Sequence, residues 1–577
     1  MATKIVMMLL GLTLILIVAC GGAPAAPEPT AAPAAEPTAA PVESEPSQPT
    51  STPQEAAPPA EVEVNPGKLT WLIPGMGNER FVPNYGVGGG NNYGRILHGF
   101  PIATNEKTEL LPGIATRWEV SRDGKTWTFT IRDEAKFHDG SALTADDVWW
   151  TWMNYWGKDE SGSALDRVTS SAAQGLARIV EGIERVGPNQ VSITTDIADA
   201  GLPPYISEAG PNWWGVLPRR PKVHDDAQEA AYDMNPIAAG PMKLVQHVIA
   251  DLMAFERFDD YYYQPENGLP EDRRPKFQSL DVRLVPEEAT RVAALRAGEA
   301  DIAPASVATR SQVEAGGGRL VFGPEGLYLR VLPLGCYNPQ YPCHDKRVRQ
   351  ALDYAIDKEL MQDQLWGSEV FQVKGWQYVT PSAIGYSSDL DPWPFDPEKA
   401  RQLLAEAGYP GGEDFGKLIV NTWVSIGMPF LPESAQIAAD SWRRELGLDV
   451  EVRVGDQAAL NLLTTSGDLD GQLLWRENEA RFDPGNLTRQ SYGTPGHSRR
   501  LHENQEIFDL VQEALMIFEP AERSAAFNRV FQRLREETYE LGIGYVNIPW
   551  AVGPRVVEWQ PWPLSFYPSA LHTITLK

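Results

Sequence analysis

Hydrophobic and polar residues follow two different spacings in the region just beyond residue 66. Residues 68–73 form a short strand-forming run, and residues 127–131 alternate with the period of two that half-buried strands show. Residues 143–156 instead place their apolar side chains at helical spacing. We expect three tryptophans of this helix to be core residues: Trp149, Trp150 and Trp152.

The second half of the chain alternates between helices and strands. Amphipathic spacing predicts helices at 287–298, 345–365 and 397–407. A strand at 418–420, a helix at 434–446 and a strand at 448–452 then follow in order. This β–α–β run implies a parallel sheet with crossover helices, so the predicted fold class is α/β.

The first 65 residues differ from the rest. The apolar run at 5–19 is shorter than the ~20 residues of a membrane span, and it ends at Cys20. This pattern is typical of a bacterial lipoprotein signal, 1–20, in which Cys20 becomes the lipidated N-terminus; an ordinary signal peptide with an incidental cysteine is the alternative. Residues 21–65, rich in Ala, Pro, Glu and Thr, predict a disordered tether. We expect an exported protein at the cell surface or in the periplasm, anchored to the membrane through Cys20.

Composition excludes several classes of protein. With 50 Lys+Arg against 77 Asp+Glu, the net charge of −27 does not suit a nucleic-acid binder. Three cysteines and eight scattered histidines predict no metal site and no cofactor. Cys336 and Cys343 lie seven positions apart in an exported chain, so we expect a disulfide; a nucleophilic pair of either cysteine with His344 is the alternative.

Several motifs occur in an order that resembles one known family. The first are residues 111–118, 123–129, 136–140 and 143–148, and later ones are 239–241, 291–301, 345–357 and 395–409. Together they resemble the bacterial extracellular solute-binding proteins of family 5, which are receptors of ABC importers for peptides, nickel chelates and some oligosaccharides. The resemblance covers almost all of the chain after the tether.

The resemblance implies a periplasmic-binding-protein-like fold of type II, with two hinge-linked lobes and the ligand in the cleft between them. Lobe I is expected at 66–105, 205–323 and 545–577, with an inserted subdomain at 106–204, and lobe II at 324–544. The chain is expected to cross between lobes near 322–334 and 541–547. Such a protein is a receptor without catalytic residues, and we expect it to act as a monomer and to deliver its ligand to a membrane permease.

In peptide-binding relatives, an Asp shortly after a Trp pairs with the ammonium group of the ligand. In this chain Asn478, which follows Trp475, is at the aligned position. Either Glu477 or Glu479 replaces the missing carboxylate, or the ligand lacks a free amine.

Other candidate ligand-binding residues are Arg481 and Asp483, with the aromatic residues Trp475, Phe81, Tyr85, Trp376, Trp423 and Tyr545. The first hypothesis is a di- or oligopeptide receptor. Planar polar groups beside aromatic rings also suit an oligosaccharide or another neutral solute. More distant alternatives are a ligand sensor and a hydrolase that uses a carboxylate pair such as Glu477 with Glu479 or Asp483.

Overall fold

The structure is a computed structural model. It describes residues 67–76, 79–82, 91–165, 177–210, 214–219, 226–376, 379–425, 428–492, 504–564 and 569–577, all within one unit that starts at Val62. The predicted signal, Cys20, the tether and Tyr85 lie outside the described residues.

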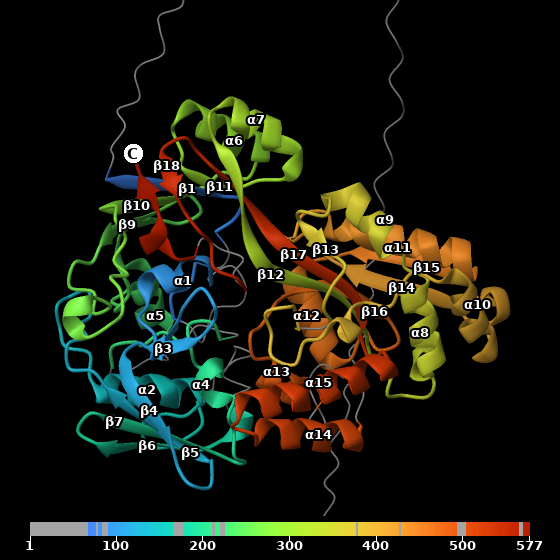
Figure 1. Cartoon of the computed structure of the whole chain (residues 1–577), viewed down its shortest axis with the longest axis horizontal. Helices are drawn as coiled ribbons and strands as arrows, with labels where there is room; N and C mark the ends of the chain where they lie inside the picture. Colours follow the sequence, from blue (N-terminus) through green and yellow to red (C-terminus); the bar gives the residue numbers. More distant parts are fainter. Residues whose placement is uncertain are drawn as a thin grey trace, which may run out of the picture. The chain divides into compact units, whose positions relative to one another are not determined.

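Two long antiparallel strands, β12 (Arg319–Pro333) and β17 (Leu541–Val552), lie in the middle of an eleven-stranded sheet and connect its two halves (Figure 1). Their pairing is interrupted between Gly323 and Leu327. On one side of this interruption β17 pairs with β11, and on the other β12 pairs with β16. The two strands contain nearly all of the residues, 322–334 and 541–547, at which the resemblance implies that the chain crosses between lobes.

One half of this sheet continues from β17 in the order β11-β1-β10-β9-β8, and we call this part lobe I. Helix α6 ends at Gly298, which adopts a left-handed conformation (φ 76°) as the sequence predicted for the end of this helix. The strands are β1 (Lys68–Ile73), β8 (Met242–Val248), β9 (Leu252–Arg257), β10 (Ser279–Leu284) and β11 (Ile302–Pro304), and the helices are α1 (Asn91–Leu97), α5 (Asp226–Met234), α6 (Glu288–Ala297) and α7 (Arg310–Ala315). The short helix α4 (Leu202–Tyr205) lies where the chain returns to lobe I from the subdomain described next. Near the C-terminus, β18 (Val556–Glu558) pairs with β19 (Thr575–Leu576).

A separate four-stranded antiparallel sheet forms the subdomain that we call the insert. Helix α2 packs on it, with the Trp152 ring 5.0 Å from that of Phe129. Trp149, Trp150 and Trp152 are all buried, which confirms their predicted core position. The elements are β4 (Ala115–Val120), β5 (Thr126–Ile131), α2 (Ala145–Tyr155), β6 (Val180–Gly187) and β7 (Gln190–Thr195), preceded by the hairpin of β2 (Ile102–Thr104) and β3 (Leu110–Pro112).

The other half of the eleven-stranded sheet, in the order β12-β16-β14-β15, is lobe II together with its helices. The predicted β–α–β run is present as β14 (Lys417–Thr422), α11 (Leu431–Leu446) and β15 (Asp449–Val454), and β14 also pairs in parallel with β16 (Leu473–Glu479). The other elements are β13 (Phe371–Gln372), α8 (Lys346–Tyr354), α9 (Lys358–Met361), α10 (Pro397–Glu406), α12 (Gln457–Ser466), α13 (Gly485–Tyr492), α14 (Gln505–Leu515) and α15 (Pro520–Glu537).

The helix predicted at 345–365 is interrupted, which corrects the sequence-based expectation. Helix α8 ends at Tyr354, and the Asp357 carboxylate accepts a hydrogen bond from the Leu360 backbone N–H (2.9 Å), which caps α9. Between the two helices the buried Lys358 ammonium group pairs with Asp353 at 2.7 Å. This pair and the cap stabilise the break.

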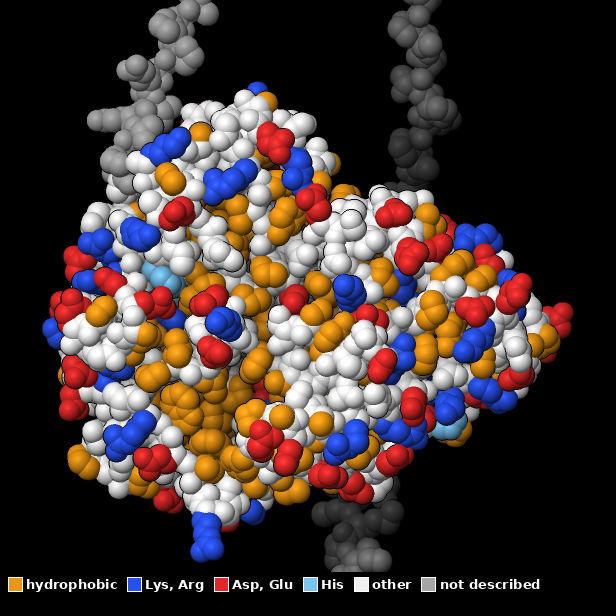
Figure 2. All heavy atoms as spheres, in the orientation of Figure 1, with side chains coloured by type: hydrophobic (Ala, Val, Ile, Leu, Met, Phe, Trp, Pro, Cys, Tyr) orange, Lys and Arg blue, Asp and Glu red, His pale blue; other side chains and the backbone are white. Residues whose placement is uncertain are grey.

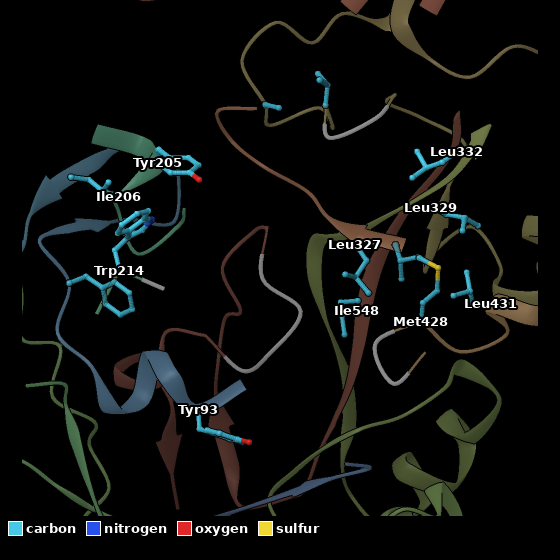
Figure 3. Close-up of a cluster of buried hydrophobic side chains, with 14 of the residues drawn as sticks. Tyr93, Tyr205, Ile206, Trp214, Leu327, Leu329, Leu332, Met428, Leu431 and Ile548 are labelled. Carbon is cyan, nitrogen blue, oxygen red and sulfur yellow. The ribbon is translucent and has the colours of Figure 1, made fainter. Parts of the chain in front are cut away.

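Hydrophobic side chains gather in both lobes (Figure 3). Tyr93, Tyr205, Ile206 and Trp214 lie on the lobe I side, whereas Leu327 and Leu329 of β12 lie beside Met428 and Leu431 of lobe II. Each lobe therefore has buried apolar side chains of its own. Just beyond β12, Cys336 and Cys343 form a disulfide with their Cα atoms 5.3 Å apart.

Candidate ligand-binding site

The carboxyl end of β14 lies beside the start of the parallel strand β16 in lobe II, with Val420 paired to Leu473, and β16 continues past it to Glu479. In open α/β sheets, ligands bind outside the carboxyl ends of the strands. The segment directly after β16 faces lobe I, because residues of both lobes line one small pocket: Thr104, Thr108, Leu110, Pro204, Ser207, Ala209, Gly210, Arg481, Phe482 and Asp483. Two of the predicted binding residues, Arg481 and Asp483, thus lie where the lobes meet.

Glu477 is held at this sheet edge by residues of the loop that follows β14. Its Oε1 atom accepts hydrogen bonds from the Ser425 hydroxyl (2.8 Å) and from the Trp423 indole N–H (3.3 Å). Its other oxygen, Oε2, is buried and has no hydrogen-bond partner among the residues that the structure describes. A buried carboxylate oxygen is costly without a partner, so this atom is suited to receive a cationic donor.

The side chain of Asn478, which is aligned with the Asp of peptide-binding relatives, already has a hydrogen-bond partner inside lobe II. Its side-chain oxygen accepts a hydrogen bond from Nε of Arg330 (2.9 Å). The fully buried Arg330 in turn pairs with Glu540 at 2.7 Å, and the Tyr492 hydroxyl donates to the same carboxylate. Asn478 therefore belongs to a buried polar network.

The other two predicted carboxylates already have cationic partners. Glu479 pairs with Arg481, and Asp483 pairs with Arg523. Asp483 also accepts a hydrogen bond from the Gly485 backbone N–H at 2.9 Å. Of the three candidates, Glu477 is the one whose carboxylate has a buried oxygen without a hydrogen bond in the described part of the chain.

Most of the predicted aromatic residues pack inside the lobes, and their role as ligand platforms stays a prediction. The Trp475 side chain is fully buried; its indole N–H donates to the Ser434 hydroxyl (2.8 Å), and its ring lies edge-on to Trp442 at 6.4 Å. Trp376 and Trp423 are each 1% exposed. Phe81 is fully buried and packs against Tyr93 and His247 in lobe I. These rings fill the cores of their lobes, because large apolar side chains gain most from complete burial.

Tyr545 lies on β17, close to the interruption between the two long strands. Its side chain is 8% exposed, and burial together with the nearby carboxylates of Glu325 and Asp391 raises the pKa of Tyr545 to about 12. The phenol therefore remains protonated and available as a hydrogen-bond donor at neutral pH.

At the interruption in the pairing of β12 and β17, a hydrogen bond still joins the two strands. Glu325 adopts a left-handed conformation (φ 53°), and its backbone N–H donates to the Asn547 side-chain oxygen at 3.0 Å. The Glu325 carboxylate accepts hydrogen bonds from the hydroxyl (2.9 Å) and the backbone N–H (3.0 Å) of Ser382. A non-glycine residue with positive φ in a long strand marks a local change of direction held by its surroundings.

Other polar residues near the strand ends were not predicted from the sequence. They are Ser425, Arg330, Glu540, Arg523, Asn486 and Asp199. They are ordinary surface residue types in an acidic chain, and only the fold brings them together from separate segments.

Neither a metal site nor a membrane-spanning helix is found in the described residues. No group of three or more metal-ligating side chains comes together there, and no described helix is long and apolar enough to cross a membrane. On the face shown in Figure 2, acidic and basic side chains are interspersed and form no single basic patch.

Two α/β lobes joined by paired strands, with polar side chains at the facing strand ends, define a periplasmic-binding-protein-like fold of type II. A sequence model of the bacterial extracellular solute-binding proteins, family 5, matches residues 109–497. The chain belongs to this family of binding proteins.

Individual relatives agree with this assignment. The dipeptide-binding protein of Escherichia coli is 28% identical over 60% of this chain and 62% of its own length, and the nickel-binding periplasmic protein of the same organism is 24% identical over 76% and 82%. The chain thus spans less than two thirds of the dipeptide-binding protein. The ABC transporter-associated periplasmic binding protein of Helicobacter pylori, solved in complex with the peptide STSA, superposes with a TM-score of 0.72 at 19% identity, covering 88% of this chain and 98% of that one.

Proposed function

We propose that this protein is the substrate-binding lipoprotein of an ABC importer and that it captures a short peptide with a free amino terminus. The observation that carries the peptide assignment is the Glu477 carboxylate, with one oxygen fixed by Ser425 and Trp423 and the other buried without a hydrogen bond in the described residues. A peptide ammonium group supplies both the charge and the donors that this oxygen lacks. Glu477 thereby takes the role of the Asp that Asn478 replaces.

The relatives support a peptide as the ligand class. The Escherichia coli relative is named for dipeptides, and the Helicobacter pylori structure contains a peptide. Another relative is named for nickel, whereas no cluster of three metal-ligating side chains occurs in the described part of this chain. The paired Arg481 and the protonated Tyr545 are further groups available to the peptide.

Capture occurs by closure of the lobes about the paired strands. We assign lobe I to 66–105, 205–323 and 545–577, the insert to 106–204 and lobe II to 324–544. Glu325 and Asn547, hydrogen-bonded to each other at the interruption between β12 and β17, lie where the rotation has to be absorbed. The closed, loaded form then presents both lobes to the permease.

The lipid on Cys20 and the tether at 21–65 keep the receptor near that permease at a high effective concentration. Mass spectrometry of the mature protein tests the anchor. A lipid-modified Cys20 at the N-terminus supports it, and release of wild-type protein into the medium with an unmodified terminus contradicts it.

Titration calorimetry with matched ligands tests the peptide assignment. We expect wild-type protein to bind a tripeptide without turnover, and to bind its N-acetylated form about 10- to 100-fold more weakly, because acetylation removes a charged hydrogen-bond donor. Glu477→Gln is expected to remove most of this difference. Glu451→Gln, which changes a carboxylate paired with Lys417 and Arg453 on β15, is the matched control and should bind as wild type does.

A wild-type protein that does not distinguish the two peptides contradicts the role of Glu477. Retention of a neutral oligosaccharide in place of peptides contradicts the ligand class, and hydrolysis of either ligand contradicts a receptor.

A further inference from the structure

A second set of polar contacts, distinct from Glu477, joins the insert to lobe II. The segment after β7 in the insert carries Asp196 and Asp199, and helix α13 of lobe II carries Asn486 and Arg489 (Figure 1). These two segments lie almost 300 residues apart in the sequence, and they meet through side chains.

Asp196 and Arg489 form the first contact. The Arg489 guanidinium donates from two nitrogens to the two oxygens of the Asp196 carboxylate, with Nη1 3.0 Å from Oδ1. The Arg489 side chain is 8% exposed and that of Asp196 is 34% exposed. A two-pronged pair of this kind has a defined geometry, and partial burial protects it from full screening by solvent.

Asp199 forms the second contact, and it is fully buried. Its carboxylate accepts hydrogen bonds from the Gly201 backbone N–H (2.7 Å) within the insert and from the Asn486 side-chain amide (3.2 Å) of lobe II. Burial raises the pKa of Asp199, and the positive charge of Arg523 opposes this shift. Asp199 thus receives one of its two hydrogen bonds, and the nearby positive charge of Arg523, from lobe II.

Arg523 lies between a carboxylate of the insert, Asp199, and a carboxylate of lobe II, Asp483. It pairs with Asp483 of lobe II, and its Nη2 atom approaches Gly201 so closely that a Cβ there would lie 2.9 Å away. A larger residue at position 201 would therefore push the guanidinium away from the insert.

Uncharged contacts extend the same interface. The Ala200 backbone N–H donates to the Leu515 carbonyl oxygen (3.0 Å), and the rings of Trp127 and Phe518 lie 6.0 Å apart. The interface therefore combines two acidic residues of the insert, two arginines of lobe II and an apolar pair.

We propose that these residues form a closure latch, which sets the balance between open and closed lobes without contacting the ligand. Opening would separate Asp196 from Arg489 and would expose Asp199, so the latch favours the closed form. A change in the closed fraction alters the apparent affinity for every ligand by the same factor. Asp196, Asp199, Asn486, Arg489 and Arg523 are positioning residues in this account, and the latch goes beyond the peptide assignment because it does not depend on ligand class.

The test combines calorimetry with small-angle X-ray scattering of the ligand-free protein. We expect Asp196→Asn and Arg489→Gln each to weaken binding of a tripeptide and of its N-acetylated form by the same factor, about 5-fold. Each is also expected to increase the radius of gyration of the ligand-free protein. The double variant should show little further loss, and the charge exchange Asp196→Arg with Arg489→Asp should recover part of the affinity.

Asp146→Asn is the matched control, because Asp146 pairs with Arg185 at 2.7 Å within the insert and does not bridge to lobe II. It should leave both readouts unchanged.

Loss of affinity for one of the two peptides alone overturns the latch, because it would mean that these residues touch the ligand. An unchanged radius of gyration in both single variants also overturns it. The scattering readout needs no ligand, so it tests the latch even where the peptide assignment fails.

Discussion

Arg330 and Glu540 form an ion pair in the interior of lobe II, with 2.7 Å between Nη1 and Oε2 and neither side chain more than 1% exposed. Removal of one partner would leave the other charge buried and uncompensated. We expect Glu540→Gln to lower the free energy of unfolding by about 3 kcal/mol, measured by urea denaturation.

A matched control for this variant is Glu536→Gln, which alters an exposed carboxylate on α15 and should change the unfolding free energy by less than about 0.5 kcal/mol. Equal effects of the two variants would contradict the importance of the buried pair.

A substitution of Trp475 distinguishes a role in the core of lobe II from a role in ligand binding. Trp475→Phe removes the indole N–H that donates to Ser434 and leaves a space beside Trp442. We expect a loss of about 1–3 kcal/mol in the free energy of unfolding and peptide affinity within about twofold of wild type. A large loss of affinity at unchanged stability would restore the ligand contact expected from the sequence.

The Cys336–Cys343 disulfide closes a short loop directly after β12. A loop of this length is expected to contribute about 2 kcal/mol by restricting the unfolded chain. The double variant Cys336→Ser with Cys343→Ser should therefore unfold at lower urea concentration than the wild type and still bind peptide. Free thiols at both positions in the native, air-oxidised protein would contradict the disulfide.

Stability is expected to fall on mild acidification because of buried histidines. Burial lowers the pKa of His138 to about 4; the positive charge of Lys243 acts in the same direction, and Asp139 opposes the shift. Burial also lowers the pKa of His572 to about 4. Since the folded pKa lies below that of the unfolded chain, the unfolded state binds protons first. Stability is thus complete above about pH 6.5 and is lost between about pH 6.5 and 4, by up to about 3 kcal/mol for His138.

Thermal melts across this pH range test the assignment. His138→Gln retains a donor for the Gly240 carbonyl oxygen and should reduce the pH dependence, whereas the control His344→Gln should keep it in full. The same dependence of melting temperature on pH in the wild type and in both variants would contradict the role of His138.

Sequence spacing predicted the local elements better than the site. The β–α–β run and the buried tryptophans of α2 follow from periodicity, because burial of a face determines both. The break at Asp357 was missed, since a capping aspartate inside a helical pattern also reads as an exposed helical residue.

The site depends on contacts between distant segments, which no local pattern records. Glu477 and Glu479 are equivalent in the sequence, and they differ only because Arg481 pairs with Glu479 while Ser425 and Trp423 orient Glu477. Likewise, the sequence shows Trp475 only as a neighbour of the candidate carboxylates, and the fold is needed to show that its ring is buried with its indole N–H donating to Ser434 on α11.

A crystal structure of the protein with a bound tripeptide tests the central claim most directly. The account predicts that the peptide lies between the lobes with its ammonium nitrogen about 3 Å from Oε2 of Glu477, a normal charge-assisted hydrogen bond. An ammonium group held elsewhere, with Oε2 of Glu477 still unpaired, would contradict the account.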